Sequence, residues 1–475
     1  MLDENLYSDH LHYVTHSVHD KNYDPNKPRI RDLLWKHLDW LTEMDNTGKA
    51  RSVVLDNVHK TLLCNTSYLG YDVFECPNCG EENFLFRHCH SRFCTSCGVK
   101  KQKELAAKAE VMCLDVKHRH IVFTIPEQYR FLFRKDRDAL NLLFVASRNS
   151  ICKLFNENIY RKEKRKRKKT GQIRNKKDNR YLYRNFKYQN KFGMIASLHT
   201  FGRALNWNPH IHCLVAELIY DPKTDNYKEV NYFNYVNLRK TWQYEINRLL
   251  LEHFGNKFRK IMNESYNDYN NGFYVYAKQK EIYNNTNSSY SKNTSGCVNY
   301  MMRYSSRPPM AESRILSYNK QDDSIVWFYD DHTTEERIEV RESGLELLKK
   351  MIIHIPDNNF RMVRYYGFYS NKNQELLEKL HEKLGAVRRI SKTKNERKRL
   401  LAAKLNKLKF RTMCMDTYNR DVLLCDCGNY MTYIDSYNPL DGISNDRQYR
   451  KMCINEMREM WLRRKSPPIR YRTSS

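Results

Sequence analysis

The stretch of this chain that decides its fold is Ser197 to Glu217, SLHTFGRALNWNPHIHCLVAE. Asn208-Pro209 is a turn signal, and the apolar run CLVA behind the two histidines is typical of a strand that enters a core. Residues two apart on a strand point to the same face of the sheet. His210 and His212 would therefore present two imidazoles side by side, and two neutral imidazole nitrogens can hold one divalent metal.

The His-x-His pattern alone does not establish a metal site, because the chain contains 17 histidines. The nearest alternative is HRHIVFTIP at residues 118–126, which also leads into a strand; there we interpret His120 as part of the sheet. Gly193 to His199 (GMIASLH) predicts a strand that pairs with the strand of His210 and His212. The other pairs of this pattern are His10/His12, His88/His90 and His118/His120.

Length and charge narrow the class of protein. A chain of 475 residues is long enough for two to four domains, and 40% hydrophobic residues suffice for buried cores. The 83 Lys and Arg against 55 Asp and Glu leave a formal charge of +28, which favours a nucleic-acid partner over solubility alone.

The compartment follows from the N-terminus and the cysteines. MLDENLYSDHLHY has acidic residues and no apolar core, so we expect no signal peptide, and no segment reaches the apolar length of a membrane span. Fourteen cysteines without an export signal indicate reduced thiols and metal ligation rather than disulfides. We therefore expect a cytoplasmic protein.

Two Cys-x-x-Cys-Gly knuckles lie fourteen residues apart in the N-terminal part of the chain. Each knuckle supplies two sulfurs on a tight turn, and two such turns can close a tetrahedral zinc site. Four thiolates leave no open coordination position, so the predicted site is structural rather than catalytic. The predicted zinc ligands are Cys76, Cys79, Cys94 and Cys97.

Further cysteines and basic residues accompany the knuckles. Cys64 and Cys89 either build a second zinc site or are packing residues. Cys414, Cys425 and Cys427 form a weaker C-terminal cluster, one ligand short of a zinc ribbon. The basic residues around the knuckles suit contacts with DNA phosphates; they are Arg87, Arg92, Lys100 and Lys101.

A third feature is an almost purely basic segment from Arg161 to Arg180, which follows the helical pattern of residues 136–160. Such a run cannot pack, so we expect a solvated loop or the end of a helix. It either contacts the DNA backbone or is a surface insertion.

A pair of tyrosines lies in the segment CVNYMMRYSSRPP at residues 297–309. If this segment is helical up to the proline pair, Tyr300 and Tyr304 lie at i and i+4 on one face. Two phenols one turn apart on a basic helix suit successive nucleophilic attack on phosphate. The spacing is accidental in the alternative interpretation, since the chain has 34 tyrosines and Tyr365/Tyr369 share it. The flanking basic residues are Arg303 and Arg307.

Several separate blocks resemble one protein family, the two-tyrosine HUH transposases of the IS91-like insertion sequences. The knuckles, with Cys64 and the step from Cys89 to Cys94, resemble the family's N-terminal zinc-binding domain. HRHIVFTIPEQYR resembles the first strand of its transposase domain, and HTFGRALNWNPHIHCLVAE its metal-binding strand. YMMRYSSRPPMAESRI resembles its tyrosine helix, and HIPDNNFRMVRYYGFYS is similar to the block that closes the domain. Together the blocks extend over about residues 30 to 430 in the family's order.

Two features depart from the family pattern. The basic insertion from Arg161 to Arg180 is longer than the pattern requires, so its role is open. The Cys425/Cys427 pair lacks the usual Cys-x-x-Cys spacing, which puts metal binding there in doubt.

The resemblance implies an α+β fold. A small zinc-binding domain of helices and ribbon precedes an HUH-type antiparallel sheet with flanking helices. The expected parts are an N-terminal extension (1–28), a zinc-binding DNA-recognition domain (29–115), a catalytic domain (116–370, with the basic insertion at 161–190) and a basic helical C-terminal region with the weak cysteine cluster (371–475).

The resemblance also implies the chemistry. His210 and His212 would bind a catalytic Mg²⁺ or Mn²⁺ that polarises the scissile phosphate, while zinc would be structural. Tyr300 and Tyr304 would cleave and rejoin single-stranded DNA at the element ends through a 5'-phosphotyrosine, as in rolling-circle movement. The fold usually adds a third polar ligand, for which the candidates are Gln279 and Asn299.

Two other functions are considered. An origin-nicking replication or transfer enzyme would use the same chemistry, but the N-terminal zinc module argues against it. A non-catalytic zinc-dependent DNA-binding protein would keep the basic surface, but the presence of both histidines and both tyrosines argues against such decay. The expected partner is DNA, near the bacterial nucleoid, and no membrane; the oligomeric state is not predicted.

Overall fold

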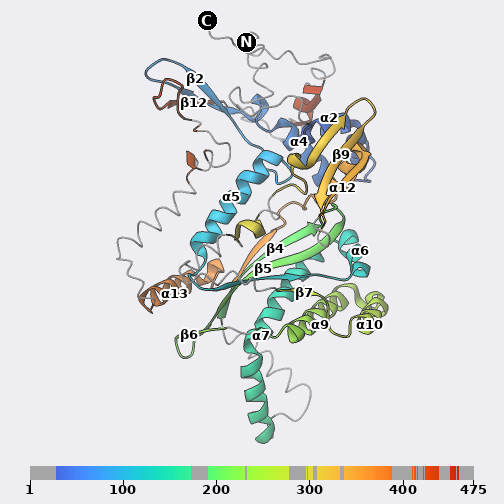
Figure 1. Cartoon of the computed structure of the whole chain (residues 1–475), viewed down its shortest axis with the longest axis vertical. Coiled ribbons are helices and arrows are strands. Elements are labelled where there is room, and N and C mark those ends of the chain that lie inside the picture. Colours follow the sequence, from blue (N-terminus) through green and yellow to red (C-terminus); the bar gives the residue numbers. More distant parts are fainter. Residues whose placement is uncertain are drawn as a thin grey trace.

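The chain is a mixed α+β protein with antiparallel sheets, as the sequence predicts (Figure 1). No helix among the described residues is long and apolar enough to cross a lipid bilayer. Short 3₁₀ turns lie at Ser67–Leu69, Gly255–Phe258, Glu312–Arg314 and Asn371–Asn373. The computed structural model describes residues 28–172, 191–230, 233–277, 296, 298–302, 307–331, 336–387, 409, 411–412, 415, 421, 423–437, 450–455 and 457–458.

A six-stranded antiparallel sheet occupies the middle of the molecule (Figure 1). Its strands are β3 (His118–Phe123), β4 (Lys191–Phe201), β5 (Trp207–Asp221), β6 (Asn226–Glu229), β7 (Val275–Tyr276) and β11 (Val363–Gly367). The order is β11-β4-β5-β3-β7, and β6 pairs with the end of β5. The predicted histidine strand is therefore the long central strand, and the predicted partner strand, β4, lies directly beside it.

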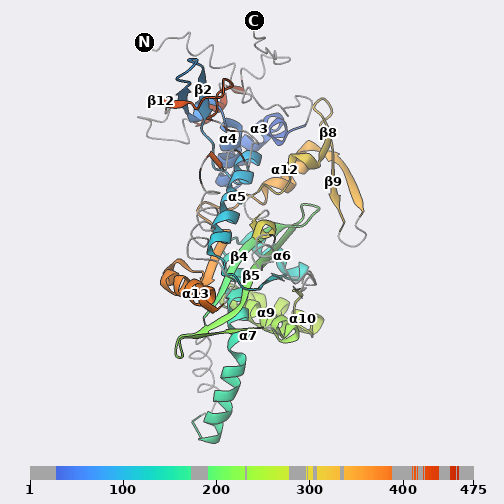
Figure 2. The ribbon, with the colours of Figure 1, turned by 60° about the vertical axis from the view of Figure 1, so that its left-hand side comes forward.

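Four helices cover one face of this sheet: α6 (Glu127–Lys135), α7 (Leu140–Lys169), α9 (Tyr235–Phe254) and α10 (Arg259–Asp268). Figures 1 and 2 both show α7 and α9 against the sheet. Ile211, Cys213 and Val215 are alternate residues of β5, and all three are fully buried in this core. The side chains between them must therefore point to the opposite face.

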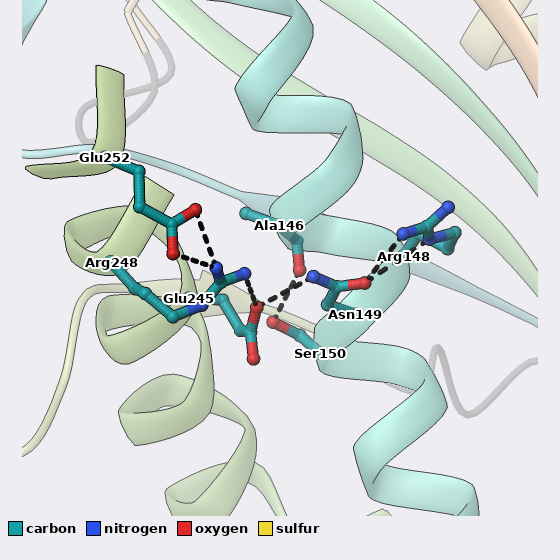
Figure 3. Close-up of polar contacts among 7 residues, drawn as sticks. All are labelled: Ala146, Arg148, Asn149, Ser150, Glu245, Arg248 and Glu252. Atoms are coloured by element: carbon teal, nitrogen blue, oxygen red, sulfur yellow. Dashed lines mark hydrogen bonds and ion pairs between the residues drawn. The ribbon is translucent and has the colours of Figure 1, made fainter. Parts of the chain in front are cut away.

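A buried polar bridge joins α7 to α9 (Figure 3). Asn149 Nδ2 donates to Oε2 of Glu245 at 2.7 Å, and Arg248 donates to the same oxygen at 2.9 Å. Arg248 also binds both carboxylate oxygens of Glu252, at 2.7 and 2.9 Å. Because Asn149 and Glu245 are each 2% exposed, these bonds supply the partners that a buried carboxylate requires. They also fix how α7 and α9 sit against each other.

The opposite face of the sheet packs against α5 (Thr95–Met112), α13 (Gln374–Val387) and the helical residues 298–302. Ile195 of β4 and Leu214 of β5 are register partners, and both lie in this core with Met301. Since side chains alternate along a strand, His210 and His212 share this face with Leu214. The tyrosine segment and the histidine pair are thus on the same side of the sheet.

The N-terminal helices share a core with a distant part of the sequence. Leu34 and Trp327 are both fully buried in this core, which also includes Ile454. The elements are α2 (Ile30–Lys36), α3 (Leu38–Asn46), α4 (Ser52–Leu63), the antiparallel sheet β10-β9-β8 with β8 (Ile315–Asn319), β9 (Ser324–Asp330) and β10 (Arg337–Ser343), and α12 (Gly344–Ile352). Residues 315–352, expected within the unit 116–370, therefore pack against the first helices, while the boundaries themselves stay a prediction.

A third antiparallel sheet lies beyond α4 and α5 (Figure 1). Its strands are β1 (Tyr71–Glu75), β2 (Glu82–Phe86) and β12 (Thr432–Tyr437), in the order β12-β1-β2. Every residue of β12 is exposed, and Phe86 is the only residue of β1 and β2 that is buried. The sheet thus has almost no hydrophobic core of its own.

The first part of the basic segment continues α7 and projects away from the sheet (Figure 2). Arg161 pairs with Glu157 at 2.8 Å and Arg167 with Glu163 at 2.7 Å, each four residues apart along the helix. This is the helix end that the sequence allows as one alternative. Residues 173–190 of the insertion lie outside the described residues.

Candidate metal centre and nucleophile

Three histidines meet on the face of the sheet that the tyrosine segment covers. The antiparallel register sets His199 of β4 opposite His210 of β5, and His212 follows two residues later. One ring nitrogen of each histidine lies within 4.8 Å of the other two. The ring centroids of His199 and His212 are 3.9 Å apart, and those of His210 and His212 are 4.9 Å apart. These three residues form what we call the histidine triad.

Burial keeps the triad neutral. Desolvation lowers the pKa of His210 to about 4 and holds the pKa values of His199 and His212 well below their ordinary value. His210 Nδ1 lies 2.6 Å from the carbonyl oxygen of Asn208, which it contacts as a donor. This bond fixes the tautomer and leaves Nε2 as the acceptor nitrogen, an arrangement common among metal-binding histidines.

A fourth histidine, which the sequence assigned only to the sheet, extends the triad. His120 is indeed in β3, where its Nε2 lies 2.8 Å from Nδ1 of His212. The two rings stack with centroids 5.0 Å apart. His118, two residues earlier on the same face, instead contacts the carbonyl oxygen of Val116 at 2.9 Å and the hydroxyl of Tyr369 at 2.6 Å. Its role is therefore structural.

Tyr300 lies against the histidines. Its ring centroid is 5.6 Å from that of His120 and 6.1 Å from that of His212, while 43% of the residue is exposed. Its neighbour Met301 is fully buried, and the carbonyl oxygen of Met301 is 3.3 Å from Nε2 of His199. The buried neighbour anchors the segment, so the phenol is held beside the triad and still reaches solvent.

Two of the three other residues predicted in this segment are not described. Tyr304 and Arg303 lie outside the described residues, so the predicted i, i+4 pair rests on the sequence alone. The alternative pair is different in kind, because Tyr369 is 1% exposed and its hydroxyl accepts from the backbone N–H of Leu114 at 3.1 Å. Burial also raises the pKa of Tyr365 to about 12. These two tyrosines belong to the core.

The position of His199 makes it a further candidate for the third ligand, beside the two candidates from the sequence. Asn299 donates from Nδ2 to Oε1 of Glu110 on α5 at 3.1 Å, so its amide is directed to that helix. Gln279 lies outside the described residues. The signal that points to His199 is the end of the predicted strand GMIASLH, which is expected to pair with the strand of His210 and His212.

Eight of the described cysteines form two clusters, and neither is the predicted set of Cys76, Cys79, Cys94 and Cys97. Each cluster has its four sulfurs within 4.8 Å of one another. In the first, Cys97 Sγ lies 3.5 Å from Cys64 Sγ and 3.6 Å from Cys89 Sγ. The two clusters are Cys64, Cys89, Cys94 and Cys97, and Cys76, Cys79, Cys425 and Cys427.

The β1–β2 hairpin explains why the predicted grouping is wrong. Cys76 and Cys79 lie in the turn at its tip, whereas Cys94 directly precedes α5 at its base, beside Cys64 at the end of α4. A five-residue strand spans about 17 Å, so the two knuckles cannot share one ion. Of the two interpretations of Cys64 and Cys89, the structure favours a shared thiol cluster, here with Cys94 and Cys97, over a role in packing alone; their zinc binding stays a prediction.

The described basic residues proposed for DNA contacts are all partly buried, but they differ in their partners. Arg87 pairs with Asp72 at 3.3 Å, and Lys101 pairs with Glu104 at 3.0 Å on α5, where Lys100 also lies. Arg307 donates to Oε1 of Gln102 at 2.8 Å. Arg92 has its Nη1 buried without a hydrogen-bond partner among the described residues, and burial lowers the pKa of this guanidinium. Arg92 is therefore the least suited of these described residues to bind a phosphate.

Known protein families match the chain in two regions, one with the first cysteine cluster and one with the histidine triad. The profile of a family described as "Transposase zinc-binding domain" matches residues 36–125, and one described as "Putative transposase" matches residues 193–376. The transposase for insertion sequence element IS801 of Pseudomonas savastanoi pv. phaseolicola is 28% identical over 359 residues, which are 74% of this chain and 77% of that protein. The putative transposase y4qJ of Sinorhizobium fredii is 23% identical over 322 residues, 66% of this chain and 73% of that protein. No solved structure matches the chain.

The two matched regions contain the features described above. The zinc-binding match includes the first cysteine cluster, and the transposase match includes the histidine triad and Tyr300. They follow each other in the order that the sequence resemblance predicts. The chain belongs to the IS91 family of insertion-sequence transposases.

Proposed function

We propose that this transposase cleaves and rejoins single-stranded DNA at the ends of its insertion sequence through a 5'-phosphotyrosine intermediate. The observation that carries the proposal is the position of Tyr300, an exposed phenol whose ring is 6.1 Å from that of His212 in the histidine triad. Tyr304, four residues later, is the second nucleophile of the proposal.

The donor set of the triad fits a divalent cation. His199, His210 and His212 offer three neutral imidazole nitrogens within 4.8 Å of one another, and His210 has its other nitrogen bonded to a backbone carbonyl. Imidazole ligands favour Mn²⁺ over Mg²⁺. When bound, the cation would polarise the scissile phosphate and offset its negative charge.

Tyr300 would form the covalent bond. Its phenol gives up its proton to the surroundings as the oxygen attacks the phosphorus. The bond from phosphorus to the 3'-oxygen breaks, and the leaving 3'-oxygen takes up a proton to become a 3'-hydroxyl. A phenol has a pKa near 10, so phenoxide is a good leaving group when a DNA 3'-hydroxyl later attacks the same phosphorus. The bond energy is therefore conserved through cleavage and rejoining, and no external energy source is required.

The zinc-binding region would recognise the DNA, and the central sheet would hold the residues that cleave it. The shared core of α2–α4 with β8–β10 and α12 would fix one region against the other. The formal charge of +28 would supply sequence-independent attraction to the DNA backbone.

The test is a covalent-adduct assay with the full chain, Mn²⁺ and single-stranded oligonucleotides from both ends of the element. Wild type should give a protein–DNA adduct that survives denaturation. Tyr300→Phe and Tyr304→Phe together should remove it. Tyr244→Phe is the matched control, because Tyr244 is 51% exposed on α9 at the other face of the sheet, and this variant should react like wild type.

The histidines are tested separately from DNA binding. His210→Ala with His212→Ala should abolish the adduct and leave oligonucleotide affinity nearly unchanged, since the basic surface carries the binding. An equal loss of binding would show that these residues hold the fold rather than a cation. An adduct that persists in the double tyrosine variant would refute the nucleophile assignment, and no adduct from wild type on either end would refute the cleavage activity.

A further inference from the structure

The second cysteine cluster joins two parts of the chain that no family match connects. Cys76 and Cys79 lie within the matched zinc-binding region, whereas Cys425 and Cys427 lie beyond both matched regions. Cys76 Sγ is 3.5 Å from Cys427 Sγ, across 351 residues of sequence, and Cys79 Sγ is 3.5 Å from Cys425 Sγ, across 346. We propose that these four thiolates bind a second structural zinc ion, which clasps the C-terminal region onto the N-terminal module.

The sulfur positions fit a tetrahedral zinc site. With Zn–S bonds of about 2.3 Å, the sulfurs of a four-thiolate site lie about 3.8 Å apart. The two Sγ–Sγ distances between the N-terminal and C-terminal cysteines, both 3.5 Å, are close to this value. All four sulfurs lie within 4.8 Å of one another. Disulfide sulfurs would be about 2 Å apart, and all four cysteines are free thiols.

The two halves of the site are built as equivalent turns. In each, a glycine with positive φ follows the second cysteine: Gly80 at +72° and Gly428 at +86°. Gly80 N–H donates to the carbonyl of Cys76 at 2.9 Å, and Gly428 N–H donates to that of Cys425 at 2.9 Å. The C-terminal turn is one residue shorter, so its sequence is Cys-x-Cys-Gly and does not match the Cys-x-x-Cys pattern.

Side-chain amides support one of the sulfurs. Asn78 Nδ2 lies 3.8 Å and Asn429 Nδ2 lies 3.6 Å from Cys427 Sγ, one from each turn. Such N–H donors stabilise the negative charge of metal-bound thiolates and orient them. The outer contacts of the cluster therefore also come from both ends of the chain.

The sheet β12-β1-β2 beside the cluster has little buried apolar surface to stabilise it. β12 pairs with β1 from Glu75↔Thr432 to Tyr71↔Tyr437, yet all six residues of β12 are exposed. Backbone pairing without buried apolar surface is marginal in water, and small modules of this kind depend on a metal for stability. The zinc ion would supply the stability that the sheet lacks, independently of the histidine triad.

The test is the zinc content per full-length chain, measured by elemental analysis after removal of loosely bound metal. Cys425→Ser with Cys427→Ser should hold one zinc fewer than wild type, and Cys64→Ser with Cys89→Ser should also lose one. The single variant Cys427→His should keep the wild-type count, because zinc accepts three thiolates and one imidazole. Cys152→Ala, a buried cysteine outside both clusters, is the control and should lose none.

Hydrogen exchange provides a second readout that does not depend on counting metal. In the Cys425→Ser, Cys427→Ser variant, the amides of residues 432–437 should exchange at least tenfold faster, while those of β4 and β5 should keep their protection. An unchanged zinc count in this variant would overturn the proposal. Loss of protection across the whole chain would also overturn it, since the site would then not be a local clasp.

Discussion

Replacing His120 with phenylalanine would test how the triad is oriented. When His212 offers Nε2 to a cation, its Nδ1–H donates to Nε2 of His120, 2.8 Å away. His120→Phe keeps an aromatic ring beside Tyr300 but removes the acceptor, so a buried N–H is left without a partner. An unsatisfied buried donor costs about 1–3 kcal/mol, and each 1.4 kcal/mol is about tenfold in affinity. We therefore expect Mn²⁺ to bind about 10 to 100 times more weakly, the range typical for loss of such outer contacts.

The assay is calorimetric titration of the full chain with Mn²⁺. His120→Gln should recover most of the affinity, because its side-chain carbonyl can accept the same N–H. His118→Phe is the matched control, since His118 lies on the same strand and face but contacts Val116 and Tyr369 instead. This control should lower the thermal stability and leave Mn²⁺ affinity within about twofold of wild type. Wild-type affinity in His120→Phe, or an equal loss in His118→Phe, would refute the reasoning.

Two further predictions concern stability. Gly367→Ala should lower the thermal midpoint strongly, because the backbone has φ +63° and an added Cβ would lie 1.5 Å from the carbonyl oxygen of Phe192. Gly48→Ala is the control, with φ +66° and nothing within 4 Å of an added Cβ. It should lower the free energy of unfolding by only about 1 kcal/mol. Burial lowers the pKa of His354 to about 3, below the unfolded value near 6.5, so stability is fully present above pH 6.5 and falls as the pH drops towards 3. His354→Gln should reduce the fall in the free energy of unfolding between pH 7 and pH 5, measured by urea titration, by up to about 2 kcal/mol. An unchanged fall would contradict the assignment.

Features that depend on local sequence signals are predictable. The turn and apolar run around His210 and His212 indicate the central strand, and the structure contains it as β5. The helical pattern of residues 136–160 corresponds to α7, and the α+β class follows from the same patterns. In each case, the residues that determine the element lie within one window of sequence, so periodicity and turn chemistry are sufficient.

Features that depend on the exact register are not predictable from the sequence in the same way. The strand ending in His199 is expected to pair with β5, but a slip by one residue would turn His199 to the α7 face. Two register shifts interrupt the pairing of β4 with β5, one between Phe192 and Met194 and one between His199 and Phe201. The local sequence pattern does not predict them. The third histidine and His120 therefore become visible only when three strands are aligned.

Features that depend on distant partners are the least accessible. The nearest Cys-x-x-Cys pair in sequence to Cys76 and Cys79 is the other knuckle, yet the hairpin separates the two knuckles and brings in Cys425 and Cys427 instead. Sequence proximity is a poor guide here, because extending a closed loop costs only about 0.6 kcal/mol for each doubling of its length. Ligands hundreds of residues apart can therefore form one site at little extra cost in loop-closure entropy.

The core shared by the N-terminal helices has a consequence for biosynthesis. Leu34 and Leu62 lie in one buried core with Trp327 and Ile454, two residues that leave the ribosome hundreds of residues later. At about 5–20 residues per second, the first helices wait tens of seconds with an apolar face uncovered. Nascent chains of this transposase should therefore recruit chaperones, and a fragment ending at residue 125 should aggregate. Such a dependence on late synthesis would keep truncated copies of the protein from accumulating in folded form.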